Sequence, residues 1–443
     1  MDLEQHAAEV LETVSRAGAE GDLIIDESQS LSLKARDGEL EEHKVSSTRV
    51  FGLRVIRDDR VGTAYSEASD SDALQSMVQQ ALINASFAKV EPEEKILSTD
   101  GELRTDDTLL CPVDKTSVDE KVRFSLAMER ELAAKSKVRN VPHNNVHDSQ
   151  AQKHLYTSAG LKAHSKQKAC IAVAFALMEE DDNNIMDGFG RATRRFGELD
   201  HLEIVEEAHK RCLGLLHGKP IPGKHYDVIF DEECQTDLFH SFTTMIFSGQ
   251  AARDGVNPMR DKVGEMVADP RLSIFDQPLL TEGFGYALFD SEGTPTRETP
   301  LIREGRLETL AHNSATAAHF GVRTTGHAWR GSRSRLGVNL HQLQIPEGDD
   351  DPATLLSGEY IEITDLAGLH SGANAVSGQF SFGAAGYLCK NGQRVQPVRN
   401  ITVAGNFYQM LQKISAIGDE CFWNIERTAL MPHIRFADVA ISG

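Results

Sequence analysis

The stretch from Tyr226 to Gln250 constrains the fold more than any other part of the chain, because it joins a short apolar run to a long amphipathic segment. Val228–Phe230 predicts a buried strand. Asp231 then offers a carboxylate to the free N–H groups at a helix start. The helix predicted after it carries apolar residues at helical spacing, namely Leu238, Phe242, Met245, Ile246 and Gly249. We therefore expect this helix to bury one face.

The polar side of this helix lacks the residues of a zinc peptidase. A metallopeptidase helix places two histidines and a glutamate here, because zinc takes N, S or O ligands and the glutamate activates the bound water. This helix has His240, followed by Ser241 and Met245. With one usable ligand, a lone polar histidine is the preferred interpretation. The pattern predicts no metal, cofactor or catalytic residue in this chain.

A histidine pair elsewhere in the chain, His143 and His147, has the four-residue spacing that would place both rings on one face of a helix. Pro142 precedes the pair and Asn144-Asn145 lies inside it. These residues favour a turn over a helix, so metal binding is the weaker interpretation.

The chain has 443 residues, more than one hydrophobic core normally supports, so two or three domains are expected. The predicted fold class is α+β. Two helix–antiparallel-sheet–helix modules, 1–90 and 116–218, precede a larger, sheet-rich mixed α/β domain at 225–443. The boundaries 90–116 and 218–225 contain prolines and lack periodicity. The acidic stretch Lys89–Lys115 is interpreted as a linker.

Local signals place individual elements within this plan. A helix is expected over Leu3–Arg16, and Asp37-Gly38 favours a hairpin. Ser117 and Glu120 form a capping-box pattern before a further helix. In the last domain, Asn406–Gly418 reads as a short amphipathic helix.

The charge and cysteine content exclude several classes of partner. A net charge of −21 opposes binding to phosphate backbones, and the basic run Arg191–Arg195 is short, so no nucleic acid partner is expected. The acidic amphipathic start is not a signal peptide. No apolar run has transmembrane length, so no membrane partner is expected. The six cysteines include no C-x-x-C pair, which indicates free thiols and a cytoplasmic protein.

Long motifs throughout the chain resemble the TldD/PmbA family of metallopeptidase-like proteins, also named modulators of DNA gyrase. They are VFGLRVIRDDRVGTAYSEASDSDALQSMVQQAL (Val50–Leu82), FDSEGTPTRETPLIREGRL (Phe289–Leu307), TTGHA (Thr324–Ala328) and GQFSFGAAGYLCKNGQRVQPVRNITVAGN (Gly378–Asn406). The resemblance covers essentially the whole chain.

The resemblance distinguishes two types of family member. The TldD type carries an H-E-x-x-x-H helix that binds zinc, and a cysteine near the C-terminus is implied as a further ligand. The PmbA type, also called TldE, lacks this motif. Here His240 matches the first histidine, Ser241 stands at the glutamate and Met245 at the second histidine. Cys421 is the only late cysteine. The chain therefore resembles the PmbA/TldE type.

This resemblance implies a hollow dimer, homomeric or heteromeric, in which an unfolded peptide reaches a zinc site in a TldD-like catalytic subunit. The chain would then be a non-catalytic subunit in proteolysis or peptide maturation, with zinc in the partner. Two alternatives remain open. One is a homodimeric peptide-binding or scaffold protein without peptidase activity. The other is a hydrolase with an unrecognised site, for which Ser241 and Ser248 are candidate nucleophiles.

Overall fold

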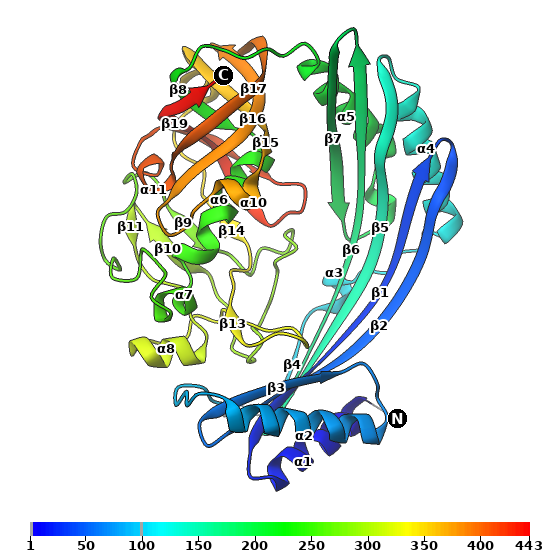
Figure 1. The fold of residues 1–443 in the computed structure, drawn as a ribbon, viewed down its shortest axis with the longest axis vertical. Coiled ribbons are helices and arrows are strands. Elements are labelled where there is room, and N and C mark those ends of the chain that lie inside the picture. Colours follow the sequence, from blue (N-terminus) through cyan, green and yellow to red (C-terminus); the bar gives the residue numbers. More distant parts are fainter. Residues whose placement is uncertain (1–2, 98–100) are drawn as a thin grey trace.

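The strand β1 (Glu20–Arg36) organises the N-terminal half of the chain, because it pairs on both sides along most of its length. Its antiparallel neighbours are β2 (Glu39–Arg57) and β5 (Val138–Thr157). The computed structural model describes residues 3–97 and 101–443, and in it seven strands form one curved sheet (Figure 1). The other members are β3 (Arg60–Ser66), β4 (Gly101–Arg104), β6 (Leu161–Glu180) and β7 (Asn183–Thr193). The two predicted modules therefore share a single sheet.

Helices cover the two ends of this sheet (Figure 1). At one end, α1 (Leu3–Arg16) and α2 (Ser71–Phe87) pack on β1, β2 and β3. At the other end, α4 (Val118–Ala133) and α5 (His201–Leu215) pack on β5, β6 and β7. The α1 bounds agree with the sequence prediction. The capping box of Ser117 and Glu120 is also confirmed, with both reciprocal hydrogen bonds present.

The interpretation of Lys89–Lys115 as a linker is wrong for its described residues. Gly101–Arg104 forms β4, parallel to β6, and Asp107–Leu110 forms the short helix α3. Leu110 is fully buried. The missing periodicity misled the interpretation, because the segment is held through single anchors, such as the ion pair of Glu94 with Arg54, and not by one continuous face.

The C-terminal domain is built around a closed ring of strands. The strand β8 (Lys224–Phe230) pairs parallel with β15 (Glu359–Ala367) and antiparallel with β19 (Ala429–Ser442). The ring continues from β19 through β17 (Gln393–Asn406) and β16 (Gln379–Lys390) back to β15. In this ring and the helices packed on it lies the largest buried apolar cluster among the described residues.

Shorter elements complete the described chain. These are the 3-10 helix Phe196–Glu198, α6 (Glu232–Ile246), α7 (Gly249–Arg253), β9 (Ile274–Asp276), β10 (Thr299–Arg303), β11 (Arg306–Leu307), α8 (Ser314–Phe320), β12 (Ala328–Trp329), β13 (Gly337–Val338), β14 (Leu343–Gln344), α9 (Pro352–Leu355), α10 (Leu369–Gly372), α11 (Phe407–Met410) and β18 (Ile414–Trp423). Strands contribute more of the chain than helices, and the α+β class is confirmed.

The predicted helix over Asn406–Gly418 is mostly wrong. Only α11 is helical, and the chain continues as β18, paired with β19. The apolar residues of this stretch satisfied a helical period, but the neighbouring strand offered β18 a hydrogen-bonding partner.

Among the helices of residues 3–97 and 101–443, none combines the length and apolar character needed to cross a membrane.

Buried charges join the C-terminal domain to the sheet. The Arg330 side chain is 1% exposed and donates to the Asp22 carboxylate of β1 and, over 3.2 Å, to the Gly52 carbonyl of β2. Arg54 of β2 donates to Asp22 over 2.6 Å and to Glu94 over 3.0 Å. The buried Glu292 carboxylate also lies 3.9 Å from Arg54, so two guanidinium groups and three carboxylates meet inside this interface.

The interface is close enough to require a glycine at position 52. A Cβ atom added there would lie 2.0 Å from the backbone oxygen of Ser332. Ser332 is itself held in place, since its N–H donates to Asp26 of β1 over 2.7 Å. Neither backbone can move away without breaking hydrogen bonds of the sheet or the hydrogen bond between Ser332 and Asp26.

We expect Gly52→Ala to weaken the contact between the two halves of the molecule. The methyl group overpacks the interface, and the free energy of unfolding should fall by about 1–3 kcal/mol. The matched control is Gly197→Ala, where the new Cβ meets only Thr116 at an ordinary 3.7 Å. Urea denaturation should show the control unchanged or slightly more stable. Equal stability of both variants would contradict the role assigned to Gly52.

Candidate functional site

The helix α6 follows β8 directly and is capped as its sequence predicts. Asp231 accepts a hydrogen bond from the N–H of Cys234 over 2.9 Å, and its other oxygen pairs with Arg211 over 2.7 Å. Leu238, Phe242 and Ile246 are buried, as expected. Met245, predicted on the same face, is only half-buried, because it lies at the border between the buried and the exposed sides.

The ligand positions of the family helix do not assemble a zinc site in this chain. His240 lies on the exposed side of α6. The Ser241 hydroxyl donates to the backbone oxygen of Asp237 over 2.8 Å, one turn earlier in the same helix. A thioether at Met245 is a poor zinc ligand beside imidazole, thiolate and carboxylate. The donor set of α6 therefore does not fit zinc.

The other candidate residues named from the sequence make contacts that belong to the local structure. The Ser248 hydroxyl accepts a hydrogen bond from Ala251 and caps α7. The Cys421 thiol lies on β18, 3.4 Å from the oxygen of Ile345, and burial raises its pKa to about 11. His143 and His147 both lie within β5, so the predicted turn is wrong. The strand persists because its residues pair with β6, with irregular register near His143.

Two groups of at least three potential metal ligands occur among residues 3–97 and 101–443, and neither includes His240 or Cys421. One group is Asp114, Asp148 and Cys170. Lys168 lies 3.0 Å from Asp114, and Lys121 pairs with Asp148. Burial raises the pKa of the Cys170 thiol to about 12. Lysines already balance these carboxylates, so this group is an ion-pair cluster.

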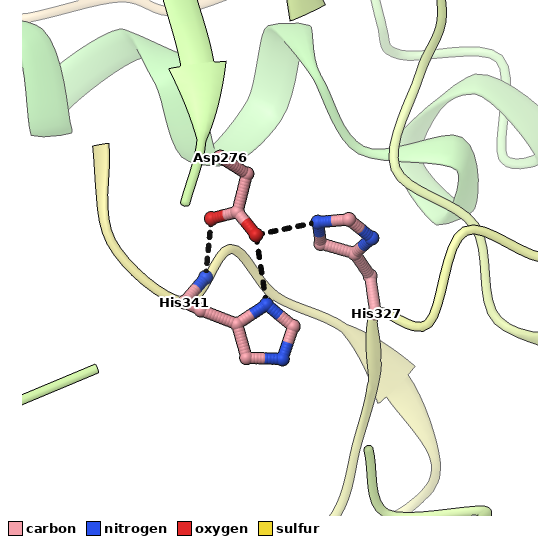
Figure 2. Close-up of side chains that lie close together, drawn as sticks. All are labelled: Asp276, His327 and His341. Atoms are coloured by element: carbon pink, nitrogen blue, oxygen red, sulfur yellow. Dashed lines mark hydrogen bonds and ion pairs between the residues drawn. The ribbon is translucent and has the colours of Figure 1, made fainter. Parts of the chain in front are cut away.

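The second group, Asp276, His327 and His341, is the candidate site (Figure 2). The Oδ2 atom of Asp276 lies 2.9 Å from Nε2 of His327 and 2.8 Å from Nδ1 of His341. Asp276 and His327 have no exposed side-chain surface, and the His341 side chain is 13% exposed. Burial opposes the charge on Asp276, but hydrogen bonds from the two histidines hold its pKa below the usual range.

Short segments from different parts of the domain bring these three residues together. Asp276 ends β9, His327 precedes β12, and His341 lies just before β14, which pairs with β9. Sequence reasoning missed this group. His327 stands inside the TTGHA motif, which was the only signal in the chain that pointed to it.

A cavity of about 440 Å³ lies beside the candidate site, between the long sheet and the C-terminal domain. His341 and Asp290 line it from the C-terminal domain, and Glu27 and Lys153 line it from the sheet. Leu155 and Phe289 add apolar surface. The cavity therefore combines charged, polar and apolar groups beside the one ligand of the group that is partly exposed.

Comparisons with known proteins agree on one family. Family models of the PmbA/TldA metallopeptidases match residues 21–85 as domain 1, 111–216 as the central domain and 222–443 as the C-terminal domain. The metalloprotease PmbA of Escherichia coli O157:H7 is 27% identical, over 98% of this chain and 96% of that protein.

Solved structures show the same fold over the full chain. A protein described as a modulator of DNA gyrase from Thermotoga maritima superposes with a TM-score of 0.89 at 26% identity, and the match covers 100% of both chains. TldE from Thermococcus kodakarensis gives a TM-score of 0.85 at 22% identity, over 99% of this chain and 100% of that one.

We expect α6 to bind no zinc. Metal analysis of the purified chain and of its His240→Ala variant should give the same zinc content, because one imidazole without a second ligand does not retain the ion through dialysis. Loss of one tightly held zinc per chain on His240→Ala would contradict this expectation.

The first turn of α6 should make stability depend on pH. Burial raises the pKa of the Glu233 carboxyl to about 7, although it accepts a hydrogen bond from the N–H of Ile425. The folded state therefore keeps this proton up to about pH 7, whereas the unfolded chain loses it near the ordinary glutamate pKa of 4.5. The stability that the protonated group contributes is complete below pH 4.5 and is lost as pH rises to 7.

Glu233→Gln should accordingly raise the free energy of unfolding at pH 8 by roughly 1–2 kcal/mol, with little effect at pH 4.5. Urea denaturation at both values measures this. The neighbouring Glu232→Gln is the matched control with opposite sign, because the hydrogen bond and charge of His433 outweigh burial and lower the pKa of Glu232. A pH-independent difference for Glu233→Gln would refute the assignment.

Proposed function

Since the chain belongs to the PmbA/TldD metallopeptidase family, we propose that it is a PmbA/TldE-type subunit of a zinc-dependent peptidase complex. In this proposal it supplies walls of a peptide-binding chamber in the cytoplasm. A TldD-like catalytic subunit contributes the zinc and the general base. The relatives support the coarser statement of a metalloprotease-family role.

The proposal rests on the residues that α6 keeps for the fold and on the catalytic residues that it lacks. The helix keeps its aspartate cap and its buried side, with Leu238, Phe239 and Phe242 fully buried. Each such side chain stabilises the fold by roughly 1.5–3 kcal/mol. The positions that would perform chemistry in a TldD-type chain hold one histidine, a serine bonded to its own helix and a methionine. The helix thus serves the fold without a catalytic set.

The cavity between the sheet and the C-terminal domain suits an unfolded peptide as substrate. A peptide presents backbone N–H and C=O groups together with varied side chains, so its binding site needs apolar surface and a few polar groups. The apolar surface comes from Leu155, Phe289 and Trp329, and the polar groups come from Gln167 and Asn339. Folded proteins are excluded by the size of the cavity, which is about 440 Å³.

The chain should form a dimer and act only with a partner. Stable interfaces of permanent complexes bury on the order of 2,000 Å² or more, so sedimentation at micromolar concentration should show a dimer of this chain or a heterodimer with the partner. Cleavage of an unfolded peptide should require a TldD-type chain with an intact H-E-x-x-x-H helix. It should disappear when the glutamate of that helix is replaced by glutamine.

Two outcomes distinguish the alternatives. A dimer of this chain that binds peptides, and that neither binds nor activates a TldD-type chain, would support the homodimeric scaffold instead. Robust cleavage by this chain alone, blocked by a chelator, would show that it is a self-sufficient hydrolase and would overturn the assignment of chemistry to a partner.

A further inference from the structure

The donor atoms of Asp276, His327 and His341 are arranged as ligands of one ion. An ion about 2.1 Å from each donor requires neighbouring donors about 3.0 Å apart at right angles, or about 3.4 Å apart in a tetrahedron. Oδ2 of Asp276 lies 2.9 and 2.8 Å from the two imidazole nitrogens. All three donor atoms lie within 4.8 Å of one another. The two distances from Oδ2 therefore match the right-angle spacing to within about 0.2 Å, and the two imidazole nitrogens, at most 4.8 Å apart, complete the set.

The aspartate is already oriented for this role by its surroundings. Its Oδ1 atom accepts hydrogen bonds from the backbone N–H groups of His341 over 2.7 Å and Gln342 over 3.1 Å. These bonds fix the carboxylate plane and occupy one oxygen, which leaves Oδ2 directed at the two imidazoles. Carboxylates that bind metals are commonly held by such outer contacts.

His327 has the outer contact typical of a metal-bound imidazole. Its Nδ1 atom lies 2.8 Å from the hydroxyl of Thr325. Metal-ligating histidines almost always donate the N–H that does not face the ion to an oxygen, which selects the tautomer and fixes the ring. Here the ring is fully buried, and the Thr325 hydroxyl is the oxygen on that side.

The proton rearrangement that an ion needs leaves no buried group without a partner. Without an ion, Nε2–H of His327 donates to Asp276. With an ion, the proton moves to Nδ1 and is donated to Thr325. The Thr325 hydroxyl then directs its own hydrogen to the carbonyl oxygen of His312, which lies 3.2 Å away. His341 makes the simpler change, from Nδ1–H to Nε2–H.

An ion can reach this group from the cavity. Asp276 and His327 are buried, but His341 is 13% exposed and lines the 440 Å³ cavity. Three protein ligands at the wall of a cavity leave a coordination position for water or another ligand, as in catalytic and not in structural zinc sites.

We propose that Asp276, His327 and His341 form a binding site for one divalent first-row transition ion, zinc being the reference case. Two imidazoles and a carboxylate suit such ions, whereas calcium and magnesium prefer oxygen ligands alone. This site is separate from α6 and revises the expectation of a chain without metal. It depends on neither the peptidase partner nor a catalytic role for this chain.

The test uses the full chain stripped with a chelator and titrated with Zn²⁺ by calorimetry, and with Co²⁺ by visible absorption, which reports the ligand geometry. We expect one ion per chain. His240→Ala should bind zinc as the wild type does. Thr325→Val, which removes the outer contact of His327 together with the hydrogen bond that the Thr325 hydroxyl accepts from the His312 N–H, should weaken binding roughly 10–100-fold. His327→Gln and His341→Gln should weaken it further and change the Co²⁺ spectrum.

Folding of each metal-free variant is checked by circular dichroism and thermal unfolding. Should His327→Gln fail to fold, His341→Gln decides, because that ring is partly exposed and its replacement keeps a similar size. Absence of zinc binding at micromolar concentrations would overturn the proposal. Binding that survives both histidine variants, or that is lost on His240→Ala, would also overturn it. Asp276 would then be the acceptor of a purely structural hydrogen-bond cluster.

Discussion

The contact of the Arg330 guanidinium with the Asp22 carboxylate holds the two halves of this molecule in register. The two residues are 308 positions apart in the chain, and both are buried. Burial disfavours the charge on Arg330, and Asp22 restores part of that loss. Removing Asp22 would deprive two buried guanidinium groups, Arg330 and Arg54, of their shared carboxylate, and breaking such a buried pair typically costs about 3–5 kcal/mol. The cavity, whose walls come from both halves, depends on this contact.

Local signals in the sequence predicted helices well where one or two residues determine the position of a helix end. Asp231 caps α6, Ser117 and Glu120 form the capping box of α4, and α1 has the expected bounds. The motifs also identified the family. These predictions succeeded because a cap or an amphipathic period acts within one or two turns of chain and needs no knowledge of the tertiary fold.

Features that depend on distant pairing were not predictable in the same way. The two predicted modules share a sheet because β1 pairs with β5, more than one hundred residues away, and nothing local to β1 encodes that partner. The packed strand β4 was taken for part of a linker for the same reason. Asp276 is 51 residues from His327 and 65 from His341, so no spacing rule for metal ligands could have joined them.

The family motif lies on α6, yet the group of three potential metal ligands at Asp276 lies elsewhere in the same domain. On α6, the Ser241 and Thr244 hydroxyls donate to the backbone of their own helix. At Asp276, four donors converge on one carboxylate. A degenerate family motif is therefore a poor guide to where a chain retains convergent polar groups.

The closed ring of strands in the C-terminal domain limits how another chain can attach. In a ring, paired segments have no free backbone N–H and C=O groups to offer an added strand, and β19 already pairs with β14 and β18 in addition to its ring neighbours. The long sheet is different in the described residues, since β3 ends it on one side and β4 and β7 lie along the other. Addition of an extended strand therefore has edges available in the N-terminal half, whereas the paired segments of the ring offer no backbone groups to it.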